Sequence, residues 1–191
     1  MVSKIMKKTK QKILKTASKL FSESSFSDVS MQKIAQKLGI TKPALYHHFK
    51  SKKEIYFEVL NESFERLKKE IEKRVSLVKS KEEILSKTIE GYLEFCLKEK
   101  NLIRLLHLKP SGKEAKMKGN LEKIKRQINC FLQEKLEKVL KNPEFIHYLL
   151  GALEGIAMKV KNSSKKKLNA KKLASQITKV CLWLNQNKKY V

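Results

Sequence analysis

Residues 31–50 read MQKIAQKLGITKPALYHHFK, and the spacing of their small and apolar members is typical of a helix-turn-helix. Ala35 is small where two helices must cross closely, and Gly39, four residues later, can adopt the positive φ that ends a helix. Leu45 and Phe49 then share one face of a second helix, which they seat on the first. The stretch therefore predicts two short helices joined by a tight turn.

The second of these helices has an outward face of polar rings and cations. Thr41 is placed to cap its start, and Pro43 falls in its first turn, where a missing N–H costs nothing. The outward face carries Lys42, Pro43, Tyr46 and His47, with His48 at its edge. A recognition helix offers such side chains to base edges and phosphates in the major groove of DNA. Just beyond it, where the next helix begins and its N–H groups suit a phosphate, stand Lys50, Lys52 and Lys53.

Simpler interpretations of the same residues remain open at this stage. Tyr46 is also compatible with a packing aromatic, and Lys52 with a solvated lysine. The adjacent His47 and His48 could suggest a metal site, but neighbours on a helix point about 100° apart. No cysteine or carboxylate stands at ligand spacing beside them, so we expect no metal.

Composition favours an all-α protein. The chain has 191 residues, of which 41% are hydrophobic, with only six glycines and three prolines to support loop-rich β structure. Three widely spaced cysteines indicate reduced thiols rather than a disulfide framework. No apolar run approaches the roughly 20 residues of a membrane span, and no signal peptide is evident, so we expect a cytoplasmic protein without membrane contact.

Helix-start signals recur along the rest of the chain. Ser51, Ser80 and Ser111 each precede a glutamate by three residues, the pattern of a capping box, and Asn142 and Asn169 are further candidate caps. With three compact helices before residue 51, this gives about nine helices, the later six over 51–78, 81–99, 101–108, 113–140, 143–161 and 169–187.

The charge is the strongest compositional signal. Forty-four basic residues against nineteen acidic ones give a formal charge of +25, which attracts polyanions such as nucleic acid or an anionic membrane. Much of it is equally explained as solvated lysine on exposed helices. The lysine-rich stretch 159–172, which has seven lysines and no acid, is best interpreted as a solvated connection between helices.

Residues 10–57 resemble the N-terminal DNA-binding domain of TetR-type transcriptional regulators. The resemblance is carried by ILKTASKLF, by SFSDVSMQKIAQKLGI and above all by TKPALYHHFKSKKEIYFEVL, which ends at residue 60. It implies a three-helix DNA-binding domain over 1–50 and a helical effector-binding and dimerisation domain over 51–191. Two positions depart from the family pattern: Ser25 stands where glycine usually precedes the aromatic residue, and Met31 replaces a small hydroxyl residue, which argues against a direct DNA contact there.

The same resemblance implies roles for individual residues. Ser30, Met31 and Gln32 would lie against the DNA backbone, and His48 and Lys52 would meet phosphates. The groove-facing set would be Thr41, Lys42, Pro43, Ala44, Tyr46 and His47.

The C-terminal helices are expected to pair two copies of the chain. The segment FIHYLLGALEGIAM is apolar nearly all round, and glycines four residues apart let another helix approach. The resemblance implies a four-helix dimer interface; an intramolecular core pair is the alternative. The expected interface residues are Tyr148, Gly151, Ala152, Gly155, Ile177, Val180, Trp183 and Leu184.

The helices between 51 and 140 are expected to hold a small apolar or amphipathic effector, although ordinary core packing explains most of their larger residues. The candidates are Phe64, Tyr92, Phe95, Cys96, His107, Met117 and Phe131. Glu154, in an apolar context, is either a polar anchor or part of the dimer rim.

The predicted function is a sequence-specific transcriptional regulator, most plausibly a dimeric repressor that leaves a pseudo-palindromic DNA operator when its effector binds. A non-specific architectural DNA-binding protein is the alternative, and the charge supports it. No phosphate loop, nucleophile elbow or Cys/His constellation at a meaningful spacing is found, so we expect neither an enzyme nor a cofactor.

Overall fold

The computed structural model describes residues 2–24, 26–99, 103, 105–107, 117–162 and 168–187. Within these ranges the chain is all-helical, with no strand, which confirms the predicted fold class. The helices are α1 (Val2–Glu23), α2 (Met31–Leu38), α3 (Lys42–His48), α4 (Lys52–Val75), α5 (Lys81–Lys98), α7 (Lys118–Glu137), α8 (Pro143–Asn162) and α9 (Ala170–Gln186). None of these helices is long and apolar enough to cross a membrane.

The predicted helix over 101–108 is described only in part. Ile103, Leu105 and Leu106 are helical and buried, and His107 closes the turn, while the rest of that stretch lies outside the described residues. The expected cap at Ser111 and the expected helix start at residue 113 also lie outside them. The seven-lysine stretch is interrupted at 163–167 for the same reason.

The other predicted starts are confirmed by hydrogen bonds. The hydroxyl groups of Ser51 and Ser80 each accept the N–H three residues later at 3.1 Å. The amide oxygens of Asn142 and Asn169 do the same at 3.1 and 2.9 Å. Each side chain satisfies an N–H that has no partner within its own helix.

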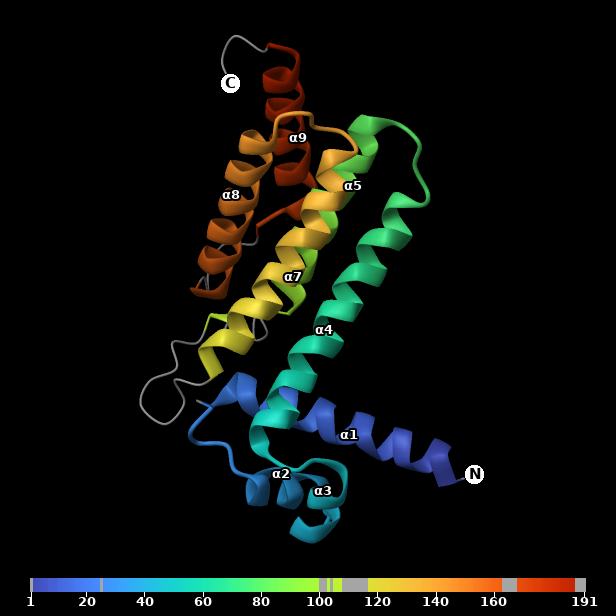
Figure 1. Ribbon diagram of the computed structural model, residues 1–191, viewed down its shortest axis with the longest axis vertical. Coiled ribbons are helices and arrows are strands. Elements are labelled where there is room, and N and C mark those ends of the chain that lie inside the picture. Colours follow the sequence, from blue (N-terminus) through green and yellow to red (C-terminus); the bar gives the residue numbers. More distant parts are fainter. Residues whose placement is uncertain are drawn as a thin grey trace.

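The elements form two ends joined by one long helix. Figure 1 shows α1, α2 and α3 at the lower end, and α4 rising from them beside the bundle of α5, α7, α8 and α9. Within that bundle α5 is central, because it contacts α4, α7, α8 and α9. Buried residues from both ends belong to one continuous hydrophobic core.

Helices α4 and α5 approach each other closely. A Cβ added to Gly91 would lie 3.0 Å from Cγ1 of Ile71, so a larger residue there would force the Ile71 side chain to shift. Beside it Arg74, on α4, forms ion pairs with Glu70, Glu90 and Glu94 at 2.7, 3.7 and 2.9 Å. The hydrogen bond from Arg74 lowers the pKa of the Glu70 carboxyl. These charges fix the orientation of α4, and therefore of the lower end, against the bundle.

The turn between α2 and α3 is closed by a left-handed glycine. Gly39 has φ 68° and ψ 29°, and its N–H donates to Gln36 O while the N–H of Ile40 donates to Ala35 O, both at 3.1 Å. The positive φ predicted for Gly39 is confirmed, and the two hydrogen bonds form a Schellman motif.

We expect Gly39→Ala to lower the free energy of unfolding by about 1–2 kcal/mol, because the added Cβ meets no neighbour and the cost lies in the backbone conformation alone. Gly119→Ala, at an equally open position inside α7, is the matched control and should raise stability by up to about 1 kcal/mol. Urea unfolding of both variants measures the difference. Equal effects at the two sites would contradict the assignment of strain to Gly39.

Candidate nucleic-acid interface and internal cavity

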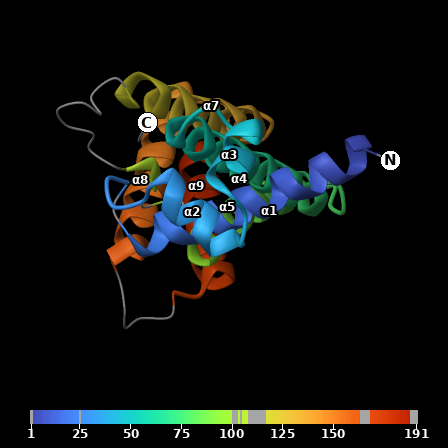
Figure 2. The ribbon, with the colours of Figure 1, turned by 90° about the horizontal axis from the view of Figure 1, so that it is seen from below.

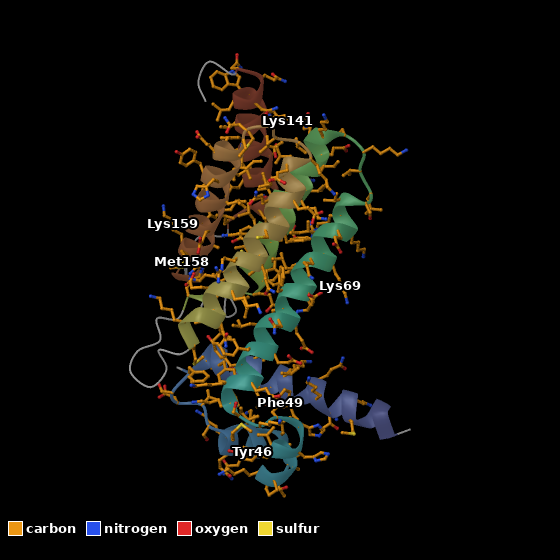
Figure 3. The ribbon with its side chains drawn as sticks, in the orientation of Figure 1. Tyr46, Phe49, Lys69, Lys141, Met158 and Lys159 are labelled. Atoms are coloured by element: carbon orange, nitrogen blue, oxygen red, sulfur yellow. The ribbon has the colours of Figure 1, made fainter. Side chains whose placement is uncertain are left out.

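Helix α3 is held by its inner face and leaves its outer face in solvent. Leu45 and Phe49 are 0% and 1% exposed, whereas Tyr46 is 45% exposed. Thr41 caps the helix by accepting the N–H of Ala44 at 3.3 Å. Figure 3 labels Tyr46 at the lower end of the molecule and Phe49 nearer the bundle, consistent with the predicted division into an outer and an inner face.

The predicted groove-facing residues are therefore accessible together. All six are exposed: Thr41, Lys42, Pro43, Ala44, Tyr46 and His47. His48 is half-buried, and the centroid of its ring lies 5.6 Å from that of His47. The ammonium group of Lys42 lies 6.0 Å from the centroid of the Tyr46 ring. No carboxylate belongs to α3, whose sequence is KPALYHH. The view from below in Figure 2 shows α2 and α3 turned to the same open side.

A shallow hollow of about 410 Å³ lies between the start of α2, α3 and the start of α4. It brings together five residues of the predicted DNA-binding set: Ser30, Gln32, Lys42, Tyr46 and Lys52. It is also lined by Ser27 and Lys50. The sequence offers no spacing signal for Ser27, and Lys50 was left out of the predicted site set although it is the last residue of the 31–50 stretch. Met31 is 7% exposed, belongs to the hydrophobic core and also lines this hollow.

Lys52 has a structural partner that the sequence did not indicate. Its ammonium group donates a hydrogen bond of 2.6 Å to the backbone carbonyl of Phe26 and lies 4.1 Å from the centroid of the Phe26 ring. This contact ties the start of α4 to Phe26, between α1 and α2. Ser25, where the family pattern usually has glycine, lies outside the described residues. One backbone N–H group at the start of α4 already has a partner within the chain, because the Glu54 carboxylate accepts the N–H of Lys50 at 2.6 Å.

The predicted effector residues do not form one pocket. Tyr92, Phe95 and His107 line a small cavity of about 30 Å³ that opens to solvent beside Glu154 and Lys125, whose side chains are 43% and 26% exposed. Phe64 and Phe131 instead meet edge to face, 6.3 Å apart, at the seam of α4 and α7 beside an open groove of about 560 Å³. Cys96 and Met117 are buried, 0% and 2% exposed, and line neither space.

The cavity combines apolar walls with a cluster of polar groups. His107 Nδ1 lies 3.9 Å from Glu154 Oε1, and Lys125 and Asn129 line the same space. Burial raises the pKa of Tyr92 well above its ordinary value, and it raises the pKa of its neighbour Cys96 to about 12. Of the lining residues, sequence reasoning singled out Glu154 as a possible polar anchor, but it missed Leu67, Ile103, Leu106, Lys125, Ile128 and Asn129. No pattern in the sequence marks Asn129, because its neighbours Lys125, Arg126 and Gln133 on the same helical face are polar as well.

Helix α8 is buried on one side only within the chain. Ile146, Leu149 and Leu153 are at most 6% exposed, whereas Tyr148 is 69% exposed. A Cβ added to Gly151 or Gly155 meets nothing within 4 Å, so no intrachain helix uses these glycines for close packing. On α9, Val180 and Trp183 are 57% and 54% exposed. All eight residues predicted for the dimer interface are exposed or half-buried, and Figure 1 shows α8 and α9 on the side of the molecule away from α4.

An all-helical chain with a capped helix-turn-helix at one end, the recognition helix exposed and free of acids, belongs to the class of helix-turn-helix DNA-binding regulators. The described residues contain no cluster of three or more histidine, cysteine or acidic side chains that could hold a metal ion.

Comparison with known proteins places the chain within this class. Residues 13–59 match the family model of bacterial regulatory proteins, tetR family. The chain is 25% identical over 146 residues to an uncharacterised HTH-type transcriptional regulator of Haemophilus influenzae, covering 74% of this chain and 68% of that protein. It spans between 43% and 66% of the length of seven other curated HTH-type regulators that it matches.

Solved structures agree in fold. A TetR/AcrR-family transcriptional regulator from Aquifex aeolicus is similar with a TM-score of 0.68 at 25% identity, over 90% of this chain and 98% of that one. The fatty acid degradation regulator FadR of Bacillus halodurans reaches a TM-score of 0.74 at 15% identity, over 91% and 94%. In the sequence of its DNA-binding end and in its fold, the chain is therefore similar to TetR-type transcriptional regulators. Proteins of this type bind DNA, typically as dimers, and are not in general enzymes.

The contact of Lys52 with Phe26 predicts that Lys52 and the adjacent Lys53 differ in their contribution to stability. We expect Lys52→Ala to lower the free energy of unfolding by about 1.5–3 kcal/mol, because it removes a charge-assisted hydrogen bond to a half-buried turn. Lys53→Ala, at the next and exposed position, should stay within about 0.5 kcal/mol of the parent. Urea unfolding of the two variants measures this. If the two proteins were equally stable, Lys52 would have to be assigned to DNA alone.

Proposed function

We propose that this protein is a dimeric repressor that binds a pseudo-palindromic DNA operator and is released by a small apolar or amphipathic effector. In this proposal residues 1–50 bind DNA, and residues 51–191 bind the effector and form the dimer. The observation that carries it is the outer face of α3, where Lys42, Tyr46 and His47 are exposed over a fully buried Leu45.

On the DNA side each exposed group has a chemical counterpart. The Lys42 ammonium group suits the O6 and N7 acceptors of guanine, and the Tyr46 hydroxyl and His47 ring reach base edges or phosphates. Thr41, Pro43 and Ala44 bring the start of α3 into the groove, while Ser30, Gln32 and His48 position the backbone. Lys52 lines the same hollow and adds positive charge there, besides holding the turn.

The dimer is supported by what α8 and α9 leave uncovered. Three of the six large hydrophobic side chains recorded as exposed in the described part of the chain lie on these two helices: Tyr148, Val180 and Trp183. Between them the open surface at Gly151 and Gly155 admits a helix at close range. A twofold arrangement then places two copies of α3 on successive major grooves, about 34–36 Å apart.

The effector site is supported by the cavity between α4, α5, α7 and α8. At about 30 Å³ it accommodates about one water molecule, so a larger ligand must push its walls apart. A ligand that binds the widened form shifts the population toward it. Because α4 runs from this cavity to α3, the widened form holds the two recognition helices at the wrong spacing, and the operator is released.

The experiment that tests the function is a selection of binding sites from random duplex DNA with the purified protein at about physiological salt. We expect recovery of a pseudo-palindrome bound about 10³-fold or more tightly than random duplex. Binding without preference that disappears as salt rises would overturn the proposal in favour of the architectural alternative, which the charge of +25 also supports.

Within the recovered operator, Lys42→Ala should relax preference at one or two base pairs by about 1–3 kcal/mol each. Lys69→Ala, on α4 and far from Tyr46 in Figure 3, is the control and should leave the preference unchanged. Repeating the selection with each variant measures the change. An unaltered preference in Lys42→Ala would show that another face of α3 reads the bases.

Trp183→Glu should convert the dimer to a monomer, because it places a charge in the apolar interface. Operator affinity should then fall by at least about 100-fold, since two half-sites no longer bind together. Leu77→Glu, at an exposed apolar side chain in the turn after α4, is the matched control. Sedimentation measures the oligomeric state of both variants, and a binding assay measures their affinity for the operator. A dimeric Trp183→Glu protein with full affinity would show that α8 and α9 do not form the dimer interface.

A further inference from the structure

Tyr56 connects the DNA-binding end of the chain to the wall of the cavity. It lies in the first turns of α4 and is 0% exposed. Its ring packs edge to face against Phe21 and Phe26, with centroids 5.2 and 5.0 Å away. These two rings belong to α1 and to the turn before α2. At its other end the Tyr56 hydroxyl donates a buried hydrogen bond of 2.8 Å to the carbonyl of Leu105.

Leu105 belongs to a short turn of helix that also forms part of the cavity wall. In this turn the N–H of His107 donates to the carbonyl of Ile103 at 3.2 Å, and the N–H of Ile103 to that of Glu99 at 3.1 Å. Ile103, Leu106 and His107 line the cavity, while the Leu105 carbonyl is bonded to Tyr56. The same few residues therefore contact both the cavity and the aromatic cluster of the DNA-binding end.

We propose that the Tyr56 hydroxyl is the group through which a displacement of this cavity wall reaches the helix-turn-helix. The proposal rests on the proposed effector response and assigns that response to one side chain. Tyr56 touches neither DNA nor ligand in this account; it is a positioning residue.

The physical basis is the cost of leaving a buried polar group without a partner. If a ligand moves the turn at Ile103–His107 outward, the Leu105 carbonyl moves with it. Either the Tyr56 ring follows, or a buried hydroxyl and a buried carbonyl are separated away from water, which is unfavourable. A ring that follows must move between Phe21 and Phe26, and Phe26 is fixed to Lys52 at the edge of the DNA-facing hollow. Motion of the wall is thus passed to the turn that supports α2.

A purely structural role for Tyr56 makes a different prediction. Packing alone depends on the ring, which Tyr56→Phe retains, so that variant should behave as the parent in every coupling measurement. A transmitting role depends on the hydroxyl, which Tyr56→Phe removes. Because coupling between two sites is reciprocal, DNA binding must in turn affect the cavity wall, and the test needs no identified effector.

The first experiment is hydrogen exchange at the amides of Ile103 and His107, with and without DNA. The probe is the duplex recovered by selection, or random duplex at low ionic strength if none is recovered. In the parent we expect DNA to slow this exchange by about 5-fold or more. In Tyr56→Phe the effect of DNA on these amides should fall below about 2-fold, while DNA affinity is retained. Ser63→Ala, which removes another buried hydroxyl from α4, is the matched control and should behave as the parent.

The second experiment imitates a ligand with a larger side chain in the cavity. Ile128→Trp, on the α7 wall, exceeds the space of about 30 Å³ and must displace its surroundings. We expect it to weaken DNA binding about 10-fold in the Tyr56 background and less than about 3-fold with Tyr56→Phe, a non-additivity that identifies the pair as coupled. If Tyr56→Phe fails to fold, as judged by its melting curve, Ile128→Trp alone decides. Faster exchange at His107 with weakened DNA binding then supports the proposal, and faster exchange with unchanged DNA binding overturns it.

The failures of the two proposals are distinguishable. Absence of any preferred operator overturns the proposed function. Two results would overturn only the role of Tyr56 and leave the effector response in place. The first is that DNA still slows amide exchange at Ile103 and His107 in Tyr56→Phe; the second is that Ile128→Trp weakens DNA binding equally with and without the Tyr56 hydroxyl.

Discussion

Burial of Leu45 and Phe49 is the constraint on which the DNA-binding end depends. A helix of seven residues is too short to be stable by itself in water, so α3 exists because these two side chains are enclosed by its neighbours. Because Leu45 and Phe49 are sufficient to hold the helix, the remaining positions of α3 can carry side chains suited to an external partner rather than to the core. Lysine, tyrosine and histidine there contribute little to the core, and their chemistry matches bases and phosphates.

The distribution of charge follows the same division. Several acids of α4 and α5 are paired: Arg74 contacts Glu70, Glu90 and Glu94, and Glu90 has a second partner in Lys87 at 2.8 Å. Helix α3 carries no acid. The positive field is therefore partly compensated around the bundle and uncompensated on the recognition helix, so the net charge of +25 acts most directly where DNA would lie.

The features that sequence reasoning predicted are local, and those it missed are not. Helix starts at Ser51 and Asn169, and the left-handed turn at Gly39, are set by residues within five positions of one another. The bond from Lys52 to Phe26 spans 26 positions and that from Tyr56 to Leu105 spans 49, so no local pattern announces either. The division of the predicted effector residues between two places has the same origin. Large side chains were selected by type, whereas whether Phe64 faces the cavity or the α4–α7 seam depends on how α7 crosses α4.

The small size of the cavity links affinity to switching. In a roomy preformed pocket a ligand could bind with little effect on the surrounding helices. Here a ligand larger than water must spend part of its binding free energy on moving the walls, and one of those walls is bonded to Tyr56. A ligand shifts an equilibrium only by the difference in its affinity for the two forms, here the closed and the widened cavity. The free energy used to move the walls is therefore the free energy that can change the position of the DNA-binding end. A cavity smaller than its ligand therefore favours a regulator whose effector binds less tightly than its contacts alone would allow and releases DNA more completely.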